Sequence, residues 1–171
     1  MTRVVLSLGS NLGDRLARLQ TVVDELGDRV VVVSPVYETP PWGGVEQEPF
    51  LNAVVIADDP HLGARQWLAE AHRLEEANSR ERTVKWGPRT LDVDIVTCHD
   101  GAEEVLSDDP TLTLPHPLAH QRAFVLIPWL VIDPTARLAG RSVAGLLTAI
   151  DEDEQSGVHR TPLVLGRARD R

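Results

Sequence analysis

The chain has 171 residues, 42% of them hydrophobic and 25% charged, with a formal net charge of −9 at pH 7. This length fits one domain with a sizeable core, and the hydrophobic content excludes a disordered chain. The acidic balance argues against general binding of nucleic acid or of an anionic membrane. Cys98 is the only cysteine, which excludes an intramolecular disulfide, and no apolar run approaches the roughly 20 residues of a membrane span. We therefore expect a cytoplasmic protein.

The first third of the chain predicts a strand, a glycine loop, a helix and two more strands. Residues 4–8 predict a buried strand, and apolar residues at spacings of three and four predict a helix from about 14 to 26. The loop between them lacks the Gly-Lys-Ser/Thr ending of a nucleotide phosphate loop, so a tight strand-to-helix turn is favoured over a phosphate site. Residues 30–37 predict an edge or bulged strand, because Pro35 cannot donate to a ladder. Residues 50–57 predict a third strand.

The loop at residues 38–49 is long and contains three prolines and two glycines. Loops of this length inside a compact domain are often functional. Trp42 within it is either a ligand lid or ordinary packing, and the sequence leaves both open. After the loop, Asn52 lies two residues from Phe50 and therefore on the same strand face. A buried Asn must be hydrogen-bonded, either to the backbone or to a heterocycle edge that needs a paired donor and acceptor.

A second helix, at 63–77, is followed by a basic loop at 78–90 and an acidic strand at about 91–97. The order so far is strand, helix, strand, strand, helix, strand. This order is typical of the split βαβ pattern. It predicts an α+β fold, a ferredoxin-like α/β sandwich with a mainly antiparallel sheet and helices on its faces.

The acidic strand carries Asp92 and Asp94, which alternate with apolar residues and so project from one face. Two adjacent carboxylates repel unless a cation sits between them, and Mg²⁺ often binds through one or two carboxylates plus substrate phosphates. The alternative is a solvated strand face without a metal. Four cations occupy the ten residues just upstream, and together with the two acids they indicate a site for phosphoryl transfer. These cations are Arg80, Arg82, Lys85 and Arg89.

The last third of the chain predicts shorter elements. We expect a short strand around 104–106, an extended piece at 111–117, helical turns at 119–131, a final helix at 142–150 with Ser142 as its N-cap, a solvated acidic turn at 151–154 and a strand at 163–165. His116 and His120 have the spacing of a zinc pair but lack the Glu that follows the first His, and Pro117 precedes any helix. The favoured role for His116 is that of a hydrogen-bond donor to a phosphate group.

Six strings together resemble one family, the 6-hydroxymethyl-7,8-dihydropterin pyrophosphokinases. The resemblance is collinear over about residues 4–134, and its longest string, residues 86–94, is highly specific. The strings are Leu8-Gly-Ser-Asn-Leu-Gly13, Tyr37-Glu-Thr-Pro-Pro41, Phe50-Leu-Asn-Ala53, Trp86-Gly-Pro-Arg-Thr-Leu-Asp-Val-Asp94, Leu114-Pro-His-Pro117 and Arg122-Ala-Phe124.

The resemblance implies a ferredoxin-like fold, two Mg²⁺ ions and transfer of pyrophosphate from ATP to the pterin hydroxymethyl group, with release of AMP. It implies metal binding by Asp92 and Asp94 and catalytic roles for Arg80, Arg89, Asp92 and Asp94. It implies ATP binding by Glu75, Arg82, Lys85, Trp86, Arg89, Thr113, His116 and Arg122. It implies a pterin pocket of Thr39, Pro40, Trp42, Phe50, Asn52 and Phe124. The chain departs from the family pattern at Lys85, Thr111 and Pro117.

Two other functions remain open at this point. One is a nucleotidyl- or glycosyltransferase that uses the two aspartates as its metal ligands, and release of AMP would distinguish the pyrophosphokinase from it. The other is a non-catalytic ferredoxin-like module that binds a metabolite or RNA. We expect residues 1–171 to form one domain, with the family signature in 4–134 and a C-terminal helix and tail in 135–171. We expect a monomer whose partners are ATP and the hydroxymethyl pterin, not nucleic acid or a membrane.

Overall fold

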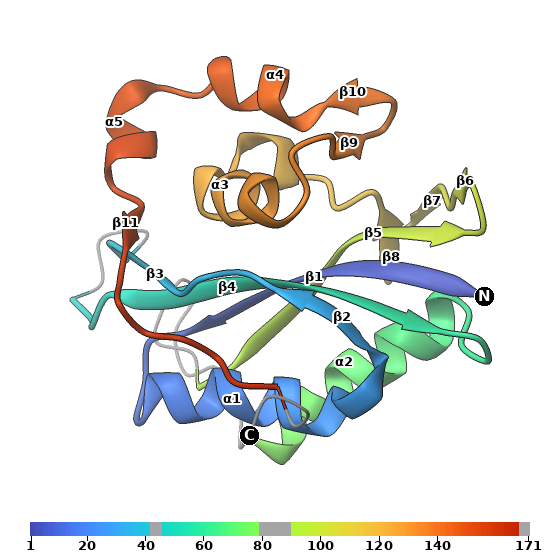
Figure 1. The fold of residues 1–171 in the computed structure, drawn as a ribbon, viewed down its shortest axis with the longest axis horizontal. Coiled ribbons are helices and arrows are strands. Elements are labelled where there is room, and N and C mark those ends of the chain that lie inside the picture. The colour runs from blue at the N-terminus through green and yellow to red at the C-terminus, as the bar shows by residue number, and fades with distance from the viewer. Residues whose placement is uncertain (42–45, 79–89, 168–171) are drawn as a thin grey trace.

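The computed structural model describes residues 1–41, 46–78 and 90–167. Within these ranges the main sheet has seven strands, five helices lie around it, and two short two-stranded sheets are attached (Figure 1). The main strands are β1 (Thr2–Ser10), β2 (Val30–Val33), β3 (Tyr37–Thr39), β4 (Phe50–Asp59), β5 (Asp92–Asp100), β6 (Glu103–Glu104) and β11 (His159–Arg160). The helices are α1 (Arg15–Leu26), α2 (Ala64–Ala77), α3 (Ala123–Ile132), α4 (Val143–Thr148) and α5 (Glu152–Ser156), with 3-10 turns at Gly27–Arg29 and Ala119–Gln121. The small sheets pair β7 (Ser107–Asp109) with β8 (Leu112–Leu114) and β9 (Arg137–Leu138) with β10 (Arg141–Ser142).

The main sheet is antiparallel, in the order β11-β3-β4-β1-β5-β6, with β2 paired to β4 beside this path. Helices α1 and α2 cover one face, and α3 and α4 lie over the other (Figure 1). The predicted α+β sandwich is therefore confirmed. No helix in the described ranges is long and apolar enough to cross a bilayer.

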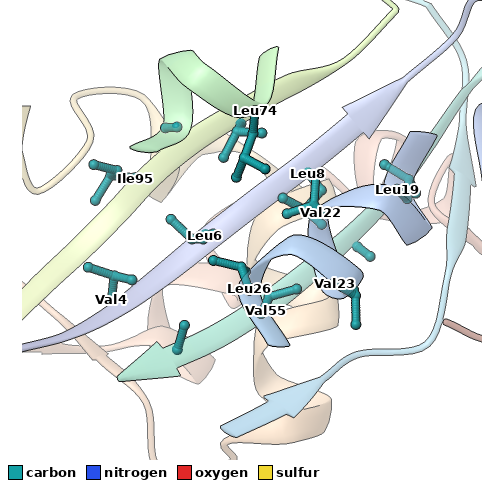
Figure 2. Close-up of a cluster of buried hydrophobic side chains, with 14 of the residues drawn as sticks. Val4, Leu6, Leu8, Leu19, Val22, Val23, Leu26, Val55, Leu74 and Ile95 are labelled. Carbon is teal, nitrogen blue, oxygen red and sulfur yellow. The ribbon is translucent and has the colours of Figure 1, made fainter. Parts of the chain in front are cut away.

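Strand β1 is central because it supplies side chains to two cores. Val4, Leu6 and Leu8 pack toward α1 and α2 in the cluster shown in Figure 2. Val5 points to the other face and packs in the cluster that includes Trp129 of α3. Burying one such aliphatic side chain stabilises the fold by about 1.5–3 kcal/mol. The two cores together pack against β1, β4 and β5 from both faces of the sheet.

The structure confirms the predicted start of α1 and the predicted cap of α4. Asp14 Oδ1 accepts the N–H of Ala17 at 3.1 Å, and Ser142 Oγ accepts that of Gly145 at 3.2 Å. The strand predicted at 30–37 with an edge position or a bulge is divided into β2 and β3, and the register of β2 against β4 shifts between Val30 and Val32, as a bulge would give. Ser34 turns its hydroxyl to accept the N–H of Val54 at 2.8 Å, and Pro35 has no N–H to donate.

For the last third of the chain, two predictions are wrong and two give the right type of element with the wrong bounds. The turns expected at 119–131 include a ten-residue helix, α3, which burial of Leu126 and Trp129 stabilises despite Pro128 inside it. The acidic turn at 151–154 is part of α5, where Gln155 Nε2 donates to two carbonyl oxygens of the preceding segment at 2.9 Å. The strand expected at 163–165 is absent from the described structure, because Leu165 packs into the α1–α2 core instead. The strand expected around 104–106 ends as β6 at Glu104.

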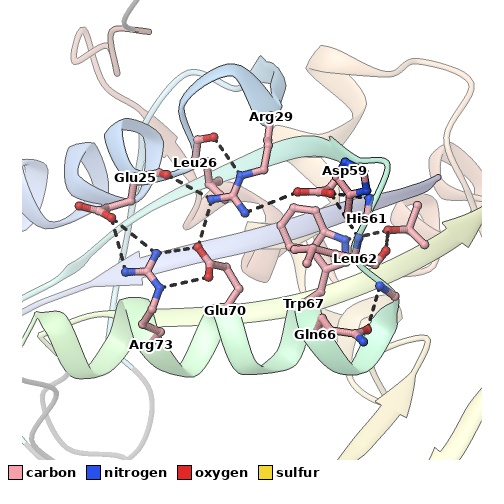
Figure 3. A network of polar contacts seen from close by, with 12 residues as sticks. Glu25, Leu26, Arg29, Asp59, His61, Leu62, Gln66, Trp67, Glu70 and Arg73 are labelled. Carbon is pink, nitrogen blue, oxygen red and sulfur yellow. Dashed lines mark hydrogen bonds and ion pairs between the residues drawn. The ribbon is translucent and has the colours of Figure 1, made fainter.

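A polar network ties α1 and β4 to α2 (Figure 3). Glu70 of α2 accepts from Arg73 Nη2 at 2.6 Å and from Arg29 Nη2 at 3.1 Å. Arg29 Nη1 also lies 3.8 Å from Asp59 Oδ2, at the end of β4. The hydrogen bond from Arg73 is the largest cause that lowers the pKa of Glu70 below its usual 4.5, with Arg29 contributing in the same direction.

We expect Glu70→Gln to lower the free energy of unfolding by about 1 kcal/mol at pH 7, near the upper end for partly exposed ion pairs. Because the pKa of Glu70 is lower in the folded chain, its contribution is present above pH 4.5 and is lost as the pH falls through the folded value. Urea unfolding at pH 7 and at acid pH measures this difference. Glu76→Gln is the control, because this exposed side chain on α2 has no ion pair among the described residues. A variant difference that is independent of pH would contradict the prediction.

Candidate functional site

The predicted acidic pair lies at one end of the sheet, on the face that α3 partly covers. In β1, Gly9 is paired with Asn52 of β4 on one side and with Asp92 of β5 on the other, while Ser7 is paired with Asp94. Residues directly opposite in an antiparallel sheet share a face. Asp92, Asp94 and Asn52 therefore lie on the same face. Val93 is buried on the opposite face, as the alternating pattern predicted.

Arg122 and His116 adjoin Asp94. Arg122 Nη1 lies 3.7 Å from Asp94 Oδ2, and its guanidinium stands 5.5 Å over the ring of Phe124. Burial lowers the pKa of His116, an effect that Asp94 opposes and Arg122 reinforces. His116 Nδ1 accepts the N–H of Leu118 at 3.1 Å, so the neutral imidazole carries its proton on Nε2. The ring is thus a hydrogen-bond donor beside the acidic pair.

Asn52 and the two phenylalanines form a second part of the site. Asn52 is 3% exposed, and its Nδ2 donates to Thr39 Oγ1 at 2.7 Å. Gly9 leaves room for it, because a Cβ at Gly9 would stand 3.3 Å from Asn52 Oδ1 and 3.5 Å from Phe50 Cδ1. The buried Asn is hydrogen-bonded, as expected, and its Oδ1 lies beside Phe50. Sequence reasoning missed Gly9, although its position in the glycine loop was a signal.

A cavity of about 290 Å³ opens beside Phe124, and the C-terminal segment forms one of its walls. Strand β11 pairs with β3, and Thr161 donates to Val36 O from both its N–H and its hydroxyl. This pairing brings α5 against the loop that follows Thr39. The sequence reading missed this wall, because its signal is a strand pairing across more than a hundred residues. The lining residues are Thr39, Pro40, Pro41, Phe124, Asp153, Glu154, Gly157 and Val158.

Glu75 lies on the opposite face from the acidic pair. It is 5% exposed, and its Oε2 accepts the N–H of Val93 at 3.1 Å. This contact holds the outer edge of β5 between Asp92 and Asp94, so the carboxylate fixes the position of the acidic pair. Thr113, in β8, donates from Oγ1 to Asp109 O at 3.1 Å. ATP contacts by Glu75 and Thr113 stay predictions.

The remaining predicted site residues belong to two segments, at 42–45 and 79–89. Those residues are Trp42, Arg80, Arg82, Lys85, Trp86 and Arg89, all outside the described residues. Within the described ranges, no three His, Cys, Asp or Glu side chains come together to hold a metal ion. Asp92 and Asp94 supply oxygen donors only. This donor set fits Mg²⁺, which completes its shell with water and substrate phosphate oxygens.

Comparison with known proteins gives one consistent family. The profile of the 7,8-dihydro-6-hydroxymethylpterin-pyrophosphokinase (HPPK) family matches residues 5–134. Curated relatives carry the name 2-amino-4-hydroxy-6-hydroxymethyldihydropteridine pyrophosphokinase. The protein from Mycobacterium tuberculosis is 55% identical over 167 residues, covering 92% of this chain and 89% of its own. The protein from Mycobacterium leprae is 56% identical over 175 residues, covering 96% of this chain and 92% of its own.

Solved structures agree with the fold. The crystal structure of wild-type Plasmodium falciparum HPPK-DHPS matches with a TM-score of 0.61 and 15% sequence identity. The match covers 86% of this chain and 40% of that one, so this chain spans well under half the length of the Plasmodium protein. At this identity the likeness shows the fold alone.

Proposed function

The chain belongs to the 7,8-dihydro-6-hydroxymethylpterin-pyrophosphokinase family, and from that membership we propose how its residues carry out the reaction. The reaction is transfer of pyrophosphate from ATP to 6-hydroxymethyl-7,8-dihydropterin, which yields AMP and the pterin pyrophosphate in folate biosynthesis. Family membership excludes the two alternatives, a nucleotidyl- or glycosyltransferase and a non-catalytic binding module. Such a transfer needs in-line positioning and neutralisation of charge more than covalent help.

We assign binding of two Mg²⁺ ions to Asp92 and Asp94. The observation that carries this assignment is the placement of both carboxylates on one face of β5, next to Arg122 and the Asn52 pocket. When bound, the ions would neutralise phosphate oxygens and polarise the phosphorus that the hydroxymethyl oxygen attacks. Buried Glu75, which holds Val93 from the opposite face, keeps the two carboxylates at a fixed spacing.

The cationic side chains of the site bind the phosphate groups of ATP. Arg122 lies within reach of groups held at Asp94, and its planar guanidinium suits two phosphate oxygens at once. Neutral His116 donates from Nε2 without adding a further charge. We propose that the basic loop completes this set with Arg80, Arg82, Lys85 and Arg89, and that Trp86 and Thr113 contact the nucleotide.

The pterin occupies the part of the site around Asn52. The chain has only two phenylalanines, and both stand here, so a flat heterocycle finds aromatic faces at Phe50 and Phe124. Asn52 offers an amide to the pterin edge, and Thr39 orients that amide. Pro40 lines the same region, and we propose that Trp42 adds a further wall.

Incubation with ATP, Mg²⁺ and the hydroxymethyl pterin tests this function. We expect AMP and pterin pyrophosphate in equal amounts. Omission of the pterin should abolish AMP formation, which separates transfer from ATP hydrolysis. Release of ADP or inorganic pyrophosphate in place of AMP would contradict the proposal. We also propose that the protein acts as a cytoplasmic monomer that binds neither nucleic acid nor membranes; its net charge of −9 supports the last point.

We expect Gly9→Ala to raise the dissociation constant for the pterin about tenfold, within the usual cost of overpacking. The added methyl would press on Asn52 Oδ1 at 3.3 Å, and it would touch the Phe50 ring at an ordinary 3.5 Å. Isothermal titration with the pterin and with an ATP analogue measures the effect, and ATP binding should stay within twofold. Gly145→Ala in α4 is the control, because its Cβ meets only Ser142 at an ordinary 3.8 Å. Unchanged pterin affinity in Gly9→Ala would show that the pocket lies elsewhere.

A further inference from the structure

A second cavity, of about 400 Å³, lies on the α3 face of the sheet at the end remote from Gly9 and Asp92. Two neighbouring cross-strand rows form its floor, where β1 is flanked by β4 and β5. The end of α3 at Trp129 and the turn after it form the opposite wall. The first row is Ile56, Val5 and Thr97, and the second is Asp58, Arg3 and His99.

Two buried polar groups belong to residues that line this cavity. Thr97 is 1% exposed and Trp129 is 2% exposed. Neither Thr97 Oγ1 nor Trp129 Nε1 has a hydrogen-bond partner anywhere in the described structure. Such orphaned groups are uncommon, because burial without a partner is costly. The indole of Trp67 is a contrast within the same chain, since its Nε1 donates to Thr2 Oγ1 at 2.9 Å.

Three of the charged side chains on the rim already have partners, and a fourth, Asp58, is the partner of Arg3. Arg3 donates to both carboxylate oxygens of Asp58, at 2.6 and 2.8 Å. Asp133 accepts from the backbone and hydroxyl of Thr135, and Arg137 donates to a backbone carbonyl. An anionic ligand that binds Arg3 would have to displace Asp58. An uncharged ligand would meet the apolar floor and the two orphaned groups instead.

We propose that this cavity is a binding site for a small, neutral, planar ring molecule that carries a carbonyl or ring-nitrogen acceptor. The acceptor takes the N–H of Trp129, which can only donate, and the hydroxyl of Thr97 makes a second hydrogen bond. The ring lies on Val5 and Ile56. The volume of the cavity is that of an ordinary small-molecule site. Both polar atoms are buried from solvent, so the side chains that line the cavity must move slightly before a ligand can reach them. We therefore expect dissociation constants on the order of millimolar for fragments.

Nuclear magnetic resonance of the ¹⁵N-labelled full chain tests this site with 2-pyridone as the probe. The chain has four tryptophans, and Trp129→Phe identifies the indole signal of Trp129 by its loss. We expect 2-pyridone to shift that signal saturably and to leave the indole signal of Trp67 in place. Thr97→Val keeps the side-chain volume while removing the hydroxyl, and it should raise the dissociation constant about fivefold to tenfold. The same substitution should leave thermal stability undiminished, because the hydroxyl has no partner to lose among the described residues.

Toluene and benzoate are the matched probes. Toluene has a similar size and no acceptor, and benzoate carries a charge, so each should shift the Trp129 signal much less than 2-pyridone does. The proposal is overturned by any of three results. The first is a Trp129 signal that does not move up to the solubility limit of 2-pyridone, as expected for a cavity that holds only water. The second is an equal shift with toluene or benzoate. The third is an unchanged affinity for 2-pyridone in Thr97→Val.

Discussion

Asp92→Asn and Asp94→Asn should each reduce the turnover of ATP to AMP by about a hundredfold or more at saturating Mg²⁺. Asparagine keeps the shape of the side chain and removes the negative charge that holds the metal. The acid pair has no substitute, because among the described residues no third His, Cys, Asp or Glu is placed to hold a metal ion together with it. Loss of one metal–phosphate contact removes several kcal/mol of transition-state stabilisation. The measurement is single-turnover formation of AMP at increasing Mg²⁺.

The control for these variants comes from the same strand. Asp100 lies at the far end of β5, where its carboxylate is 3.8 Å from the terminal ammonium of Met1. Asp100→Asn makes the same chemical change away from the site and should leave turnover within twofold. The folded fraction of every variant is checked by thermal unfolding. Near-normal turnover in either Asp92→Asn or Asp94→Asn would overturn the metal-ligand assignment.

The acidic strand was predictable because its information is local. The alternation of Asp92, Val93 and Asp94 determines which side chains share a face, whatever the rest of the chain does. The sheet then confirmed that placement through the pairing of β5 with β1. The role of Glu75 at Val93 was not predictable in the same way. Helical periodicity shows that Glu75 lies on a helix, but not which strand edge its carboxylate reaches.

The C-terminal third of the chain was harder to predict for a related reason. Strand β11 has two residues, and its pairing with β3 is what brings α5 to the cavity beside Phe124. Neither the composition nor the residue spacing of 151–160 indicates that this segment pairs with β3. The orphaned groups at Thr97 and Trp129 likewise emerge only when α3 packs on the sheet. Pairings and packing of this kind are set by the whole fold.

Asn52→Ala is expected to weaken pterin binding about a hundredfold and to leave binding of an ATP analogue almost unchanged. The amide is 3% exposed and stands between Thr39 and Phe50, so any group it recognises is withdrawn from water. A buried donor or acceptor on the ligand that loses its partner costs about 1–3 kcal/mol. The pterin edge would lose both a donor and an acceptor, which together amount to roughly 3 kcal/mol, or about a hundredfold.

The contrast between the two ligands separates recognition from support of the fold. If Asn52 only braced β3 against β4 through Thr39, its loss would loosen the sheet on which Asp92 also stands. ATP and pterin binding would then weaken together. If Asn52 reads the pterin edge, the nucleotide half stays intact, because Arg122 lies against Asp94 and His116 accepts the N–H of Leu118, so neither side chain depends on Asn52. Equal losses for both ligands in parallel titrations would therefore mark Asn52 as structural, whereas a loss confined to the pterin identifies it as the residue that selects the heterocycle.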